Sequence, residues 1–158
     1  DSNITCSKCG FTAKYNHNGK ITSESEDFKF DRIDTWYDFE KESLKKELEK
    51  DDFKLESRVM CEIANEKRAK YDPIGEGTLV MDKKAITFTA DSGKVLTYKI
   101  DKAESIPFTV GVQIFLIIDK QNYEFNFIDK MMSTKYNLAV ELLAEERDAE
   151  KEKRKGRN

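Results

Sequence analysis

Two cysteines near the start of the chain have the spacing of metal ligands. Cys6 and Cys9 are separated by two residues, and Gly10 follows directly. This spacing lets two thiolates bind one tetrahedral Zn²⁺, while the glycine permits a tight turn beneath the metal. A structural site needs four ligands, so this pair forms half a site. Three interpretations stay open: a zinc ribbon whose other pair lies upstream, a knuckle without metal, and a redox dithiol, which lacks its usual strand–helix–strand context.

Two further residues have side chains that could take part in catalysis. His17 is the only histidine and sits beside Asn18-Gly19, a turn signal, so an exposed residue is favoured over a metal ligand or general base. Cys61 lies between Met60 and Ile63 in an expected strand, which is typical of an inert core thiol rather than a nucleophile. An odd count of three cysteines indicates a reducing compartment rather than a disulfide framework.

Composition limits the function classes. The 158 residues carry 28 basic and 31 acidic side chains, giving a net charge of −3 and a pI near 5.4. This balance disfavours a nucleic-acid binder, including a zinc ribbon of that class. Aromatic residues make up 11% of the chain, enough to build a core. Because the chain begins with Asp1 rather than Met, we expect it to be part of a longer protein.

The first 50 residues predict a hairpin followed by a helix. Asn18-Gly19 favours a tight turn between strands at 11–15 and 20–23. A loose apolar side, with charged residues on the other faces, predicts a helix over 35–50. Within it, Trp36 and Tyr37 either anchor the helix against the rest of the fold or form an exposed contact for a partner.

The middle of the chain predicts seven short strands and a closing helix. Alternating apolar and polar residues, separated by turn-forming residues, indicate an antiparallel meander that folds into a sandwich or partly open barrel. An apolar stripe after the plausible N-cap Ser133 predicts a last helix over 133–150 that closes one end. The expected strands are 59–64, 77–81, 85–89, 95–100, 105–110, 112–118 and 123–127.

Five lysines near the expected turns could form a basic rim at an open end of this barrel. A basic rim attracts anionic lipid head groups, by about 1 kcal/mol for each residue near the surface. The alternative is that lysines on hairpin turns only keep the protein soluble. The five residues are Lys83, Lys84, Lys94, Lys99 and Lys102.

These patterns divide the chain into four parts. We expect a partial zinc-ribbon-like hairpin and linker over 1–33, a helix over 34–52, the main α+β domain over 53–146, and a charged tail over 147–158.

The order of three segments resembles a known arrangement. Cys6-x-x-Cys9-Gly10-Phe11, Asn18-Gly19-Lys20-Ile21 and Asp34-Thr35-Trp36-Tyr37-Asp38-Phe39-Glu40 resemble the region after the catalytic domain of clostridial-type lysophospholipid (1-acylglycerol-3-phosphate) acyltransferases. The resemblance implies that Cys6 and Cys9 are the second knuckle of a zinc ribbon. It also implies that Gly77 to Leu143 form a PH/GRAM-like domain of seven strands and a capping helix.

The same resemblance implies a function without catalysis in this chain. The acyl-transfer motif of the family is a His followed five positions later by an Asp, whereas here His17 is followed by Thr22. We therefore expect a non-catalytic accessory domain of a membrane-associated phospholipid-synthesis acyltransferase, with a regulatory, structural or membrane- and substrate-orienting role. The alternative is a stand-alone PH-like module that binds anionic lipid head groups or a protein partner.

The implied setting is the cytoplasmic side, peripheral to the inner face of the membrane. The implied partners are the N-terminal catalytic domain of the same parent chain and an anionic membrane surface, and nucleic acid is not among them. Structural Zn²⁺ on Cys6 and Cys9 is the only implied cofactor. Trp36 and the five lysines are the candidate lipid or partner contacts.

Overall fold

The structure is a computed structural model in which residues 2–5, 10–26 and 28–156 are described. It divides into two compact units, Asp1–Lys46 and Glu47–Asn158. Both contain strands and helix, so the predicted α+β class is confirmed. Each unit is treated by itself below.

The N-terminal unit contains a small antiparallel sheet with the strand order β1-β2-β3. The turn between β2 and β3 lies at the predicted place, but of the pair Asn18-Gly19 only Gly19 takes a positive φ, +80°. The N–H of Gly19 donates to the carbonyl of Asn16 at 3.0 Å, so the turn runs from Asn16 to Gly19 and is longer than the predicted two-residue turn. Glycine takes this φ without a steric penalty, which explains why Asn18-Gly19 marks the turn. The strands are β1 (Ser2–Thr5), β2 (Thr12–Tyr15) and β3 (Ile21–Thr22), and α1 (Ile33–Leu48) follows them as the predicted helix.

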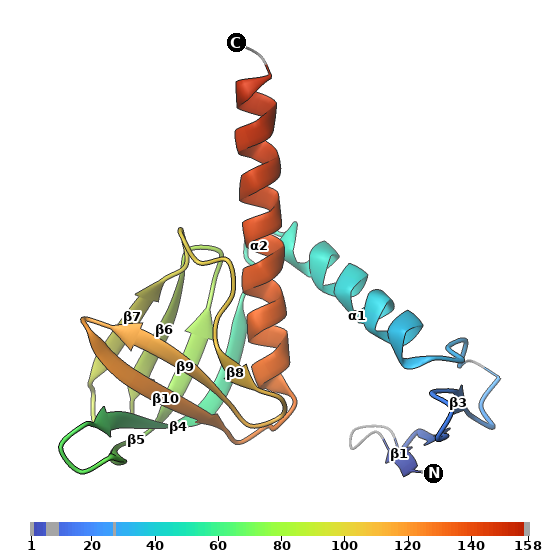
Figure 1. Cartoon of the computed structure of the whole chain (residues 1–158), viewed down its shortest axis with the longest axis horizontal. Helices are drawn as coiled ribbons and strands as arrows, with labels where there is room; N and C mark the ends of the chain where they lie inside the picture. The colour runs from blue at the N-terminus through green and yellow to red at the C-terminus, as the bar shows by residue number, and fades with distance from the viewer. Residues whose placement is uncertain (1, 6–9, 27, 157–158) are drawn as a thin grey trace. The chain divides into compact units, whose positions relative to one another are not determined.

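The C-terminal unit is built on one curled antiparallel sheet of seven strands, with the order β7-β6-β5-β4-β10-β9-β8 (Figure 1). The number of strands and their antiparallel pairing confirm the prediction. The strands are β4 (Leu55–Asn65), β5 (Lys70–Met81), β6 (Ala85–Ala90), β7 (Val95–Lys99), β8 (Phe108–Thr109), β9 (Gln113–Ile118) and β10 (Gln121–Phe127). β4 and β5 are longer than predicted, while β8 has only two residues.

The concave side of this sheet carries the core. Alternate residues of β6, β9 and β10 point inward and are apolar, as the period of two requires. β4 alternates in the same way, but the polar Ser57 is among its buried residues. Among them Val59, Phe88, Ile114 and Phe125 are fully buried. The rings of Phe88 and Phe125, from β6 and β10, meet edge-on with centroids 5.4 Å apart. Side chains from both halves of the sheet therefore fill its interior.

The last helix, α2 (Met132–Lys155), covers the open side of the curled sheet (Figure 1). Tyr136 is fully buried, and its hydroxyl donates to the carbonyl of Leu79 on β5 at 2.9 Å. Two predictions were wrong here. Ser133 is not the N-cap, because the helix begins at Met132 and the Ser133 hydroxyl donates to the carbonyl of Thr109 instead. The helix also continues to Lys155, through most of the region predicted as a tail.

Gly77 gives a test of how tightly the sheet packs. A Cβ at this position would lie 2.3 Å from the carbonyl oxygen of Thr89 and 2.5 Å from the ring of Phe88. Gly77→Ala is therefore expected to lower the free energy of unfolding by about 1–3 kcal/mol. The control is Gly156→Ala, because that site has φ −73° and its nearest neighbour would lie at 3.7 Å. Urea denaturation measures both, and equal stability of the two variants would contradict the described packing.

Candidate functional site

Four of the five predicted lysines gather at one end of the curled sheet. Lys83 and Lys84 form the turn between β5 and β6, and Lys99 is the last residue of β7. Lys99 pairs with Ala85 across the strands, and the N–H of Ile100 donates to the carbonyl of Lys84 at 3.0 Å. Lys102 follows in the next turn. We call these four residues the lysine end.

An aspartate shapes the first turn of the lysine end. The Oδ1 atom of Asp82 accepts the N–H of Lys84 at 2.7 Å and that of Ala85 at 2.9 Å. This side-chain-to-backbone pattern fixes a tight turn, so the two lysine side chains leave it from a defined position. Lys84 is exposed, and Lys83 is half-buried.

An arginine of α2 holds the second turn. Arg147 donates through Nη1 to the carbonyl of Ile100 at 3.1 Å and through Nη2 to that of Ala103. Both carbonyls belong to the segment that carries Lys102. Helix α2 therefore positions this part of the lysine end as well as covering the core.

Carboxylates offset much of the charge at the lysine end. Asp82, Asp101 and Glu104 lie on the same two turns as the four lysines. The surface thus attracts anions only weakly at a distance, and its lysines act mainly through close contact.

Lys94 does not join the other four lysines. It lies in the turn between β6 and β7. A hydrogen bond from the N–H of Ala90 to the carbonyl of Lys94, 2.8 Å long, closes this turn. This turn is at the opposite end of strand β6 from Lys84. The Nζ atom lies 6.0 Å from the ring centroid of Tyr123, the distance of a cation–π contact. The structure thus divides the predicted rim between two ends.

Trp36 lies in an aromatic cluster of the N-terminal unit. Its ring meets that of Phe28 edge-on at 5.9 Å, and Phe28 in turn contacts Phe11 at 5.2 Å. The indole N–H donates to Glu40 at 3.2 Å. Trp36 therefore has a structural role within its own unit, while its neighbour Tyr37 is 48% exposed.

The predicted metal ligands Cys6 and Cys9 lie outside the described residues. His17 lies exposed in the turn between β2 and β3. Across residues 2–5, 10–26 and 28–156, no three His, Cys, Asp or Glu side chains are grouped closely enough to hold a metal ion. Zinc binding by Cys6 and Cys9 stays a prediction.

Cys61 is a core thiol, as the sequence indicated. It is fully buried on β4 opposite Phe125 of β10. Burial raises the pKa of the thiol to about 12, and the nearby Lys94 only partly opposes this shift. At neutral pH the group is therefore protonated and a poor nucleophile.

Sequence reasoning missed a group of exposed apolar side chains on two neighbouring turns. Val110 and Val112 lie between β8 and β9, while Ile128 and Met131 lie between β10 and α2. The sequence contained one signal: apolar residues flanking the polar pair Asp129-Lys130, directly after a strand and before a helix.

Within the described part of the chain, neither helix is long and apolar enough to cross a bilayer.

The burial of Cys61 predicts its chemical behaviour. In a Cys6→Ser/Cys9→Ser variant, a thiol reagent should leave folded protein essentially unlabelled, because only about one thiol in ten thousand is ionised at about pH 8. The same reagent in denaturant should label one thiol per chain, which serves as the control. Absorbance of the released chromophore measures both reactions, and rapid labelling of the folded variant would contradict the buried position of Cys61.

Comparison with known proteins gives no match: neither a family model, nor a curated protein, nor a solved structure resembles this chain closely enough to be recognised. What the chain does is therefore inferred from its own residues and geometry.

Proposed function

We propose that the chain is a non-catalytic accessory module of a membrane-associated phospholipid-synthesis acyltransferase, and that it contacts the anionic surface of the membrane. The main support is the lysine end, where the fold brings Lys83, Lys84, Lys99 and Lys102 together from two separate turns. Lysine side chains near an anionic bilayer each contribute about 1 kcal/mol.

The architecture agrees with the PH/GRAM-like domain that the resemblance implies. Seven antiparallel strands curl around an apolar core, and one C-terminal helix covers the open side. Modules of this shape display their turns to a ligand, since the strands themselves are committed to the core. In this proposal the turns of the lysine end face lipid head groups.

The position of the N-terminal unit also fits an accessory role. In the sequence, the Cys6-x-x-Cys9 segment and the strands of the small sheet precede α1 and the curled sheet, in the order that the resemblance predicts. In the proposed parent protein, the Cys6–Cys9 pair completes a zinc ribbon with a second pair upstream, and this ribbon joins the module to the catalytic domain.

The sequence that encodes the region upstream of Asp1 tests the acyltransferase part of the proposal. A His-x₄-Asp segment followed by a C-x-x-C pair supports it. Absence of the His-x₄-Asp segment overturns the acyltransferase assignment, and the chain is then better described as a stand-alone binding module.

Vesicle flotation tests the membrane part. Wild-type chain should float with vesicles of phosphatidylcholine and phosphatidylserine, and less with phosphatidylcholine alone. Lys83→Glu/Lys84→Glu should weaken binding at least about tenfold, because it reverses two charges of the lysine end. The matched control is Lys67→Glu/Lys70→Glu, which reverses one charge in the turn between β4 and β5 and one at the first residue of β5. Equal losses in both variants would contradict a specific role of the lysine end.

A further inference from the structure

Four exposed aliphatic side chains lie on two neighbouring turns of the C-terminal unit. Met131 is 72% exposed, Val110 70% and Ile128 61%, while Val112 is 42% exposed. Large apolar side chains that gather on a surface mark sites of interaction more often than single exposed ones do. We call Val110, Val112, Ile128 and Met131 the apolar tip.

Backbone contacts hold the two turns of the apolar tip together. The N–H of Phe127 donates to the carbonyl of Val112 at 2.9 Å. A Cβ on Gly111 would lie 3.3 Å from the carbonyl oxygen of Lys130, so the two turns approach closely there. Ser133 ties the second turn to the first through its hydrogen bond to Thr109. The tip is therefore a defined surface assembled from two turns whose apolar residues lie 16 or more positions apart in the sequence.

Some backbone N–H groups of the two turns are already hydrogen bonded within the turns. The N–H of Val112 donates to Thr109 at 3.0 Å, and that of Met132 donates to Asp129 at 3.2 Å. Transfer of an unpaired peptide group into an apolar medium costs several kcal/mol, which excludes most loops from the acyl region of a bilayer. For the N–H groups of Val112 and Met132 that cost is avoided.

The charges around the tip favour an anionic surface. Helix α2 begins here with no side-chain cap and no acidic residue in its first turn, so its positive dipole end faces outward. Lys130 adds a positive charge between Ile128 and Met131. Asp129 opposes it, although its carboxylate is turned toward the N–H of Met131 at 3.4 Å.

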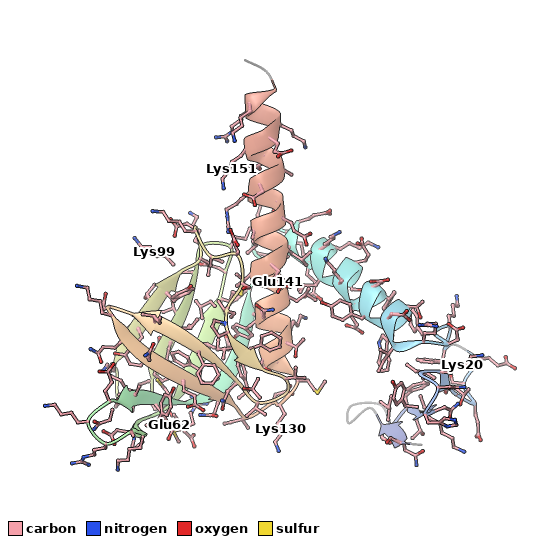
Figure 2. All side chains as sticks on the ribbon, viewed as in Figure 1. Lys20, Glu62, Lys99, Lys130, Glu141 and Lys151 are labelled. Carbon is pink, nitrogen blue, oxygen red and sulfur yellow. The ribbon has the colours of Figure 1, made fainter. Side chains whose placement is uncertain are left out.

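We propose that the apolar tip inserts into the interfacial region of an anionic lipid bilayer. This inference rests on the proposed membrane contact and assigns it a second surface. The lysine end is partly neutralised by its own carboxylates, and one weak signal gives only marginal attachment to a membrane. Figure 2 places Lys130, beside the tip, and Lys99, in the lysine end, at different ends of the C-terminal unit. The two surfaces can therefore be tested separately.

The test uses the full chain and vesicles of phosphatidylcholine and phosphatidylserine. Val110→Ser/Met131→Ser should lower the vesicle partition coefficient at least about tenfold. The variant lacks two aliphatic side chains whose transfer from water into the bilayer would favour binding. The matched control, Val95→Ser/Ile117→Ser, removes two side chains of similar exposure on β7 and β9 and should bind as the wild type does. The thermal unfolding midpoint of every variant shows whether it is folded.

A second measurement keeps the proposal open to refutation if the serine variant does not fold. In a Trp36→Phe background, Met131→Trp places a fluorophore at the tip. Insertion shifts its emission to the blue and lets brominated lipids quench it. Unchanged emission with vesicles that bind the chain would overturn insertion of the tip.

The outcomes separate this inference from the proposed function. If the serine variant loses binding and the control does not, the tip is the apolar anchor. If the serine variant binds like the wild type while Lys83→Glu/Lys84→Glu does not, the tip is excluded and the proposed membrane contact stands. If the wild-type chain binds no vesicles, both the membrane contact and the insertion of the tip are wrong.

Discussion

The stability of the C-terminal unit depends on α2 covering the apolar, concave side of the curled sheet. An aromatic ring as large as that of Tyr136 contributes much apolar surface, yet its hydroxyl must find a partner once buried. The hydroxyl reaches the Leu79 carbonyl on β5, and the ring packs 5.2 Å from that of Phe127 on β10. One side chain thus connects α2 to two strands and fixes the position of the helix along the sheet.

That position of α2 determines where both candidate surfaces lie. At its N-terminal end, Ser133 bonds to Thr109 and holds the turn that carries Val110 and Val112. In the middle, the side chain of Asn137 accepts the N–H of Ile106 at 3.0 Å. Farther along, Arg147 holds the segment that carries Lys102. The long connection between β7 and β9 is therefore attached to the helix at three levels, although little of it is strand.

The sequence predicted the elements that local patterns determine. Alternation in Tyr123, Phe125 and Phe127 revealed a strand with one buried face, and Asn18-Gly19 located a turn. The predicted meander also implies that Lys94 lies at a different end of the sheet from Lys84, which the prediction of a single basic rim overlooked. Consecutive turns of an antiparallel meander fall at alternate ends, so Lys94 and Lys84 could not share an end.

Other features depend on tertiary contacts that leave no local signal. Serine is a common N-cap residue, which favoured Ser133 for this role. In the structure, however, the Ser133 hydroxyl donates a hydrogen bond to the nearby carbonyl of Thr109. Val110 and Val112 continue the apolar pattern of their neighbours, and the expected strands 105–110 and 112–118 included them. They are exposed because β8 ends at Thr109, which leaves them in the turn.

The two surfaces differ in the range over which they act, and in the proposed membrane attachment this difference would give each a separate role. Attraction between charges is screened beyond about 8 Å at physiological salt, and Asp82, Asp101 and Glu104 reduce it further at the lysine end. Burial of aliphatic groups acts only at contact but does not weaken as salt rises. Attachment through lysines alone should therefore vanish at high ionic strength, whereas attachment through Val110 and Met131 should persist. Salt dependence measured on the unmodified chain thus indicates which contribution dominates before any residue is changed.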